Sequence, residues 1–172
     1  MINLFRTITG EARDALVELI MKNCKYDELN WAELCLKTDC YQRLMEVASE
    51  MTQYRHESSM EITDRTRTVV GVCLNVMYEQ MYDDRRRNDF YEQINAFVQS
   101  KFLEPATEAH VRATVAITTL LKNAPELGSG QIGKDGVLGM LLGMAQSDDK
   151  IQQIAAAEAL IAGKSLQIRF TM

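Results

Sequence analysis

Two histidines, His56 and His110, are the residues on which acid–base or zinc chemistry would depend. Imidazole is the side chain that most often serves as a general base near neutral pH or as a metal ligand. Neither histidine has a cysteine or carboxylate at metal-ligand spacing, and the sequence contains no HExxH, GxSxG or GxGxxG motif. Isolated histidines are more often structural or surface residues, so the sequence predicts no catalytic residue, no metal site and no cofactor.

The segment Gly163-Lys164-Ser165 matches the end of a phosphate-binding loop, in which backbone N–H groups and a lysine hold a nucleotide. Such a loop needs a glycine five positions before the second glycine, and this position holds Glu158. The segment also follows an alanine-rich stretch rather than a buried strand. A nucleotide-dependent enzyme that uses Lys164 is therefore the weakest of three functional hypotheses, and we expect the protein not to be an enzyme.

The charge balance argues against a nucleic-acid partner. The formal net charge is -5 and the pI is near 5.1, whereas phosphate binding depends on a basic surface that releases counterions. One basic run, Arg85-Arg86-Arg87, directly follows Asp83-Asp84. We interpret the run as a solvated helix end whose charges largely cancel, with a docking patch as the alternative.

The four cysteines indicate a reducing compartment. Their spacing matches neither a CxxC redox pair nor a zinc knuckle, and three of them fall on apolar helical positions. No apolar run reaches the roughly 18 residues that span a bilayer, and residues 1–6 lack the pattern of a signal peptide. We therefore expect buried free thiols, no membrane contact and a cytoplasmic location. The cysteines are Cys24, Cys35, Cys40 and Cys73.

Helical periodicity recurs along the chain and predicts an all-α fold of seven to nine helices. The first helix is expected near residues 9–22, with Ala12, Leu16, Leu19 and Ile20 on its buried face. Further helices are expected near 28–36, after residue 38 or 39, around 69–81, from about 90 to just before 105, and at 106–123.

Prolines and glycines are expected to separate the later helices. Pro105 fits the first turn of the helix at 106–123, because its missing N–H would be unpaired there anyway. Pro125, Gly128 and Gly130 are expected to break the chain after that helix.

Residues 131–162 have the order of an armadillo repeat: a short helix, a glycine turn at Gly136, an apolar second helix, a Ser-Asp-Asp break and an alanine-rich third helix. A shift by one repeat period places Val111, Val115 and Leu120 onto Ile151, Ala155 and Leu160, and a second shift of nearly the same length reaches Val72 and Val76. Any amphipathic helix shows such spacing, so the earlier matches carry less weight than the complete motif. The sequence predicts a right-handed armadillo-type α-solenoid of three to four repeats over residues 1–162, followed by an irregular or truncated tail at 163–172.

Several stretches outside this repeat are distinctive, and together they resemble the central domain of the UCS-type (Unc-class) myosin chaperones. They occur in the family's order and cover nearly residues 8–162. The stretches are Gly10-Glu11-Ala12-Arg13-Asp14, Asn30-Trp31-Ala32-Glu33, Glu57-Ser58-Ser59-Met60-Glu61-Ile62-Thr63, Val72-Cys73-Leu74 and Thr114-Val115-Ala116-Ile117-Thr118.

The resemblance implies a role, with a heat-shock chaperone of the ninety-kilodalton class, in folding and protecting the myosin motor domain. In that family a tetratricopeptide module docks the heat-shock chaperone and a C-terminal armadillo domain binds myosin. Neither module is expected in this sequence. The first functional hypothesis is therefore a non-catalytic scaffold segment of a myosin-directed co-chaperone, with its partners docking mostly through modules absent here.

The second hypothesis is an armadillo adaptor that binds another protein or an extended peptide in its groove. Peptide-binding grooves of this class carry Trp and Asn on the third helix of each repeat. The alignment above places Glu79, Thr118 and Glu158 at the Trp positions and Asp83, Lys122 and Ala162 at the Asn positions, which argues against capture of a basic peptide. The candidate groove-lining residues are Glu79, Asp83, Arg112, Thr118, Lys122, Gln152 and Glu158.

Overall fold

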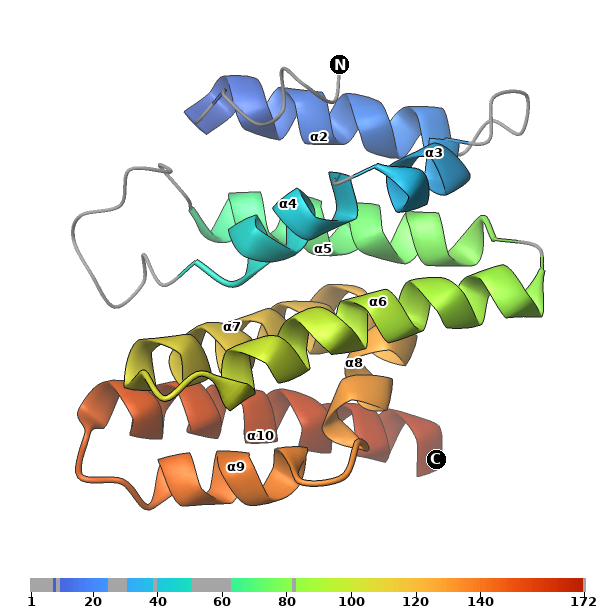
Figure 1. The fold of residues 1–172 in the computed structure, drawn as a ribbon. Coiled ribbons are helices and arrows are strands. Elements are labelled where there is room, and N and C mark those ends of the chain that lie inside the picture. Colours follow the sequence, from blue (N-terminus) through green and yellow to red (C-terminus); the bar gives the residue numbers. More distant parts are fainter. Residues whose placement is uncertain are drawn as a thin grey trace.

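The computed structural model describes residues 8, 10–24, 31–38, 40–50, 63–81 and 83–171, and this part of the chain contains helices and turns but no strand. The helices stack in layers from α2 at one end to α9 and α10 at the other (Figure 1). This arrangement confirms the all-α armadillo-type solenoid. The helices are α2 (Gly10–Cys24), α3 (Trp31–Lys37), α4 (Cys40–Ala48), α5 (Asp64–Glu79), α6 (Asp84–Leu103), α7 (Thr107–Asn123), α8 (Pro125–Ile132), α9 (Val137–Ala145) and α10 (Lys150–Thr171).

Local sequence explains where several helices begin. Thr63 caps α5, because its hydroxyl accepts from the Thr66 N–H while the Thr66 hydroxyl accepts from the Thr63 N–H. Asp83 caps α6 by accepting a hydrogen bond from the Arg85 N–H at 2.9 Å. Gly136 takes a left-handed conformation, φ 85°, at the start of α9, which confirms the expected glycine turn.

The role expected for Pro105 was wrong, whereas the expected break after the helix at 106–123 was right at Pro125 and wrong at the two glycines. Pro105 precedes the N-cap of α7, Ala106, so it lies outside the first turn. Pro125 occupies the first turn of α8, and Gly128 and Gly130 lie inside that helix rather than in a break. The missing N–H of Pro125 is tolerated at this position for the reason that was expected to apply at Pro105.

The inner face of α2 also differs from the expected one. Leu16 and Ile20 are buried as predicted, but Ala12 and Leu19 are exposed. Arg13 takes the inner position instead and is only 1% exposed. The apolar pattern alone missed this residue because burial of an arginine depends on its polar partners.

The C-terminal repeat follows the expected order, with a different ending. Ala155, Ala156 and Ala159 are buried, and α10 packs along α7 through these small side chains. An irregular or truncated tail was expected from residue 163; the backbone of α10 continues as regular helix to Thr171. No helix end marks a boundary at residue 162.

Three helices run in the same direction through successive layers: α5, α7 and α10 (Figure 1). Val111 and Val115 of α7 share one hydrophobic cluster with Ile151 and Ala155 of α10, so these two helices face each other in the predicted register. Gly71 of α5 instead faces Asn123, the last residue of α7. The sequence alignment paired Val72 of α5 with Val111 of α7. The number of residues that it assumed between facing positions of the two helices was therefore too small.

The end of α4 explains this shift. The Thr119 hydroxyl of α7 donates to the Ala48 carbonyl, and Arg112 pairs with Glu50 at 3.6 Å. The stretch that ends α4 therefore lies beside α7, and α5 meets the later part of α7.

Candidate protein-binding trough

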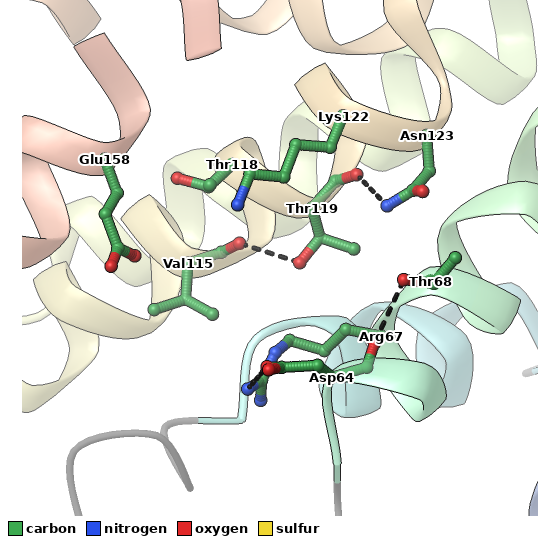
Figure 2. Close-up of a pocket in the computed structure, with 9 residues that line it drawn as sticks. All are labelled: Asp64, Arg67, Thr68, Val115, Thr118, Thr119, Lys122, Asn123 and Glu158. Atoms are coloured by element: carbon green, nitrogen blue, oxygen red, sulfur yellow. Dashed lines mark hydrogen bonds and ion pairs between the residues drawn. The ribbon is translucent and has the colours of Figure 1, made fainter. Parts of the chain in front are cut away.

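A cavity of about 410 Å³ opens where α5, α7 and α10 face one another (Figure 2). The first turns of α5, the C-terminal half of α7 and the middle of α10 supply its walls. Most of the lining side chains are polar. The residues are Asp64, Arg67, Thr68, Val115, Thr118, Thr119, Lys122, Asn123 and Glu158.

A second cavity of about 350 Å³ adjoins the first along α7 and α10. Lys122 and Glu158 border both cavities, so we treat the two as one feature, the trough. Apolar side chains dominate the second cavity. Its other lining residues are Leu121, Ile161, Ala162, Ser165 and Leu166.

Three of the seven predicted groove residues line the trough: Thr118, Lys122 and Glu158. Their positions depend on the register predicted between α7 and α10, which the structure has. The lining residues on α5, Asp64, Arg67 and Thr68, were missed. An alignment with a larger sequence shift between α5 and α7 would have placed these residues in the groove. No pattern in the sequence indicates such a shift.

The other four predicted groove residues lie elsewhere. Glu79 accepts a hydrogen bond from Asn75 at 3.2 Å near the end of α5, and Asp83 caps α6. Arg112 forms ion pairs with Glu108 and Glu50, and Gln152 contacts Asp149 at the start of α10. None of these four is among the residues that line the two cavities.

Arg67 fixes the floor of the trough. Its guanidinium is about nine-tenths buried and donates to the Asp64 carboxylate at 3.0 Å and to the Glu50 carbonyl at 3.1 Å. These bonds join the arginine to the exposed Asp64 carboxylate and to the backbone that follows α4.

The threonine hydroxyl groups of the trough donate to backbone carbonyls. Thr68 donates to the Asp64 carbonyl and Thr118 donates to the Thr114 carbonyl, both at 3.0 Å. A hydroxyl bonded in this way retains lone pairs that accept hydrogen bonds from a ligand. The hydroxyls of the lining threonines and of Ser165 donate to backbone carbonyls rather than to a carboxylate or an amine, so none of these hydrogen bonds pairs a nucleophile with a base.

Asn123 also lines the trough. Its side-chain NH2 donates to the Thr119 carbonyl at 2.9 Å, and this bond does not use the amide oxygen. Asn123 follows Lys122, the residue at the expected Asn position of the ladder, so an asparagine does lie in this groove immediately after the expected position. The exposed Lys122 beside it supplies a donor.

The remaining candidates for chemistry are structural. The ring of His110 lies 2.7 Å from the Glu104 carbonyl and contacts Phe102, whereas His56 lies outside the described residues. Residues 163–165 are part of α10, and the Ser165 hydroxyl donates to the Ile161 carbonyl, so this segment is not a phosphate-binding loop.

The basic run at the start of α6 is largely engaged. Arg86 pairs with Glu33 of α3, and Arg87 donates to the Met81 carbonyl at 2.8 Å while it lies over the Tyr78 ring. This environment fits a helix end with internal partners rather than a free docking patch.

Within the described part of the chain, no cluster of three or more histidine, cysteine or acidic side chains has an arrangement suited to a metal ion. The same residues include no helix with the length and apolar character needed to cross a membrane.

Comparison with known proteins identifies the same family along nearly the whole chain. The family model of the UNC-45 central region, described as myosin-binding striated muscle assembly central, matches residues 14–163. Protein unc-45 homolog B of Mus musculus is 24% identical over 170 residues, which cover 96% of this chain and 18% of the mouse protein.

Solved structures agree with this comparison. UNC-45 from Drosophila melanogaster superposes with a TM-score of 0.86 at 43% identity, over 93% of this chain and 20% of that chain. The myosin chaperone UNC-45 from C. elegans superposes with a TM-score of 0.81 at 21% identity, over 96% of this chain and 20% of that chain. This chain thus spans about a fifth of the length of these relatives.

Proposed function

Because the chain belongs to the UNC-45 central-domain family, we propose that it is a scaffold segment of a co-chaperone that assists the folding of the myosin motor domain together with an Hsp90-class chaperone. The family match over residues 14–163 is the observation that carries this proposal. A C. elegans relative was solved in complex with an Hsp90 peptide, and another solved structure is described by its role in binding and folding muscle myosin.

The same proposal makes the chain non-catalytic and cytoplasmic. The trough has hydrogen-bonding and apolar groups without a paired nucleophile and base, which supports a binding role. The four free cysteines support a reducing compartment.

Two assays with a purified myosin motor domain test the scaffold proposal: co-sedimentation of the chain with the motor, and recovery of motor activity after mild heating. The chain is incubated with the motor during mild heating, with and without an Hsp90-class chaperone, and soluble motor is measured by ATPase activity. We expect the chain to bind the motor or to increase the recovered activity. Equal recovery with the chain and with an unrelated helical protein, together with no co-sedimentation, would contradict the proposal.

A second candidate function is an adaptor that binds a protein segment in the trough. The polar and apolar cavities that meet at Lys122 and Glu158 favour it, because an extended peptide presents backbone polar groups and side chains together. Lys122→Glu is expected to weaken such binding at least about tenfold, since it reverses the charge at the junction of the two cavities. Lys164→Glu is the matched control, because Lys164 is an exposed lysine of α10 that lines neither cavity.

A further inference from the structure

Lys122 is the positive charge of the trough that is available to a ligand. It is exposed and borders both cavities, and among the described residues it has no hydrogen-bond or ion-pair partner. Figure 2 likewise draws no interaction between its ammonium group and the other lining side chains. The second cation of the lining, Arg67, is already bonded to Asp64 and to the Glu50 carbonyl.

The carboxylates of the lining are less available than Lys122. Asp64 is bonded to Arg67 at 3.0 Å, and Glu158 is likewise engaged. A basic segment in the trough would compete with these existing interactions and would bring its positive charge close to Lys122. An acidic group, in contrast, meets an ammonium group that loses no other partner. The charge that is available in the trough therefore favours an anionic ligand.

The polar cavity mainly offers hydrogen-bond acceptors to the remainder of a ligand. The hydroxyls of Thr68, Thr118 and Thr119 donate to backbone carbonyls, so their remaining capacity is to accept. The NH2 group of Asn123 is also used, by the Thr119 carbonyl. Acceptors of this kind match an extended protein segment, in which every residue except proline carries a backbone N–H donor.

The second cavity offers an apolar pocket next to Lys122. Leu121 and Leu166 are the buried part of its lining, whereas Ile161 is 66% exposed. Its volume of about 350 Å³ lies near the lower end of the usual range for ligand pockets. An aliphatic side chain in this pocket would remove apolar surface of Ile161 from water, which is favourable. The cavity therefore fits a side chain such as that of leucine.

We propose that the trough binds an extended acidic segment in which an aspartate or glutamate lies two positions from an aliphatic residue. Side chains two positions apart in an extended chain point to the same side. This spacing places the carboxylate at Lys122 and the aliphatic side chain in the adjoining apolar cavity, while backbone N–H groups donate to the threonine and asparagine oxygens. The proposal rests on the adaptor role of the trough and specifies the kind of segment that the trough takes.

An NMR titration of the isotope-labelled chain tests this proposal, because it detects weak binding and locates it. The probe is the capped peptide Ac-Gly-Leu-Ser-Asp-Ser-Leu-Gly-NH2, in which a leucine lies two positions from the aspartate on either side. We expect this peptide to shift the amide signals of residues 118–123 and 158–166, which contain most of the trough lining on α7 and α10. Peptides with Asn or Lys in place of Asp, or with Ala in place of both leucines, should bind at least about fivefold more weakly.

Two exposed residues allow the two contacts to be tested separately. Lys122→Met removes the cation, so this variant should bind the Asp peptide no better than the Asn peptide. Ile161→Ser should abolish the preference for leucine over alanine and retain the preference for aspartate. Lys164→Met and Ile154→Ser are the matched controls, because both residues are exposed on α10 and line neither cavity. Both controls should bind the peptides as the wild type does.

The possible failures have different meanings. If the Asn or Lys peptide bound the trough as tightly as the Asp peptide, the acidic preference would be wrong and the adaptor role would stand. If no peptide shifted the signals of residues 118–123 and 158–166, the preference and the adaptor role would both be wrong. The recovery of myosin motor activity tests the scaffold proposal independently of either result.

Discussion

The two ends of the solenoid are held together in different ways. In the region from α2 to α5, polar side chains join helices at particular points: Arg13 and Asp14 of α2 both bond the Thr66 hydroxyl of α5, at 3.3 and 2.9 Å. In the region from α7 to α10, small residues let helices approach closely, as at Gly128 and Ala156. The first kind of contact is specific to its position, whereas the second repeats along the chain.

This difference in packing explains which sequence features can be recognised in each region. Small residues at helical spacing create the armadillo-type repeat, which is why the repeat is readable in the C-terminal region. The stretch Gly10 to Asp14, one of those that resemble the family, supplies instead the buried ion pair of the N-terminal region. Thr63, at the end of another such stretch, caps α5 next to the same pair. Two of the stretches that resemble the family thus lie at the Arg13–Asp14 pair and its contact with Thr66.

The close approach at Gly128 gives the largest expected effect. A Cβ at this position would lie 2.5 Å from the Leu121 backbone nitrogen and 2.6 Å from its Cα. Because backbone atoms of a buried helix cannot move aside as a flexible side chain can, Gly128→Ala is expected to lower the free energy of unfolding by about 3 kcal/mol. Urea denaturation followed by circular dichroism measures the change.

Gly139→Ala is the matched control for this prediction. A Cβ at Gly139 in α9 has no neighbour within 4 Å, so the substitution should raise the stability by roughly 0.5–1 kcal/mol through helix propensity. Equal effects of the two substitutions would show that close packing of α8 on α7 does not hold this region together.

The buried ion pair gives the next largest effect, in the N-terminal region. The Arg13 guanidinium is almost fully buried and donates to the Asp14 carboxylate at 2.9 Å. Asp14→Asn removes the negative charge and is expected to cost about 2 kcal/mol, below the usual value for a buried pair because Asp14 is partly exposed. Glu11→Gln, an exposed change in the first turn of the same helix, should cost less than about 0.5 kcal/mol. A loss of stability no larger than that of the control would contradict a structural role for the pair.

The contrast also shows how far the sequence could predict this molecule. The helix periodicity, the Gly136 turn and the spacing of α7 and α10 all follow from local patterns, and Thr118, Lys122 and Glu158 were found in this way. The α5 wall of the trough did not follow, because the end of α4 lies against α7 and moves α5 toward the later part of that helix. Contacts between distant segments of this kind leave no periodic signal.

The burial of polar residues was the second feature that the sequence could not predict. The apolar pattern of α2 favoured Ala12 as an inner residue, but Arg13 occupies that place because Asp14 and Thr66 satisfy its guanidinium. A glycine likewise reads as a helix breaker in sequence, although Gly128 lies inside α8 where only a missing side chain permits contact with α7. In both cases a residue of another helix takes part, Thr66 of α5 for Arg13 and Leu121 of α7 for Gly128.

The smallest expected effect concerns the contact of Glu33 in α3 with Arg86 of α6. Hydrogen bonds from Lys37 and then Arg86 lower the pKa of Glu33 below its ordinary value of 4.5. A carboxylate whose pKa is lower in the folded state stabilises the protein above the unfolded-state pKa, and this contribution is lost as the pH falls through the folded-state value. The wild type should therefore have a slightly higher urea midpoint than Glu33→Gln at pH 7, and the difference should shrink as the pH falls below 4.5 and through the folded-state pKa. If the difference between wild type and Glu33→Gln stayed constant across this range, the contact between α3 and α6 would contribute nothing to stability through charge.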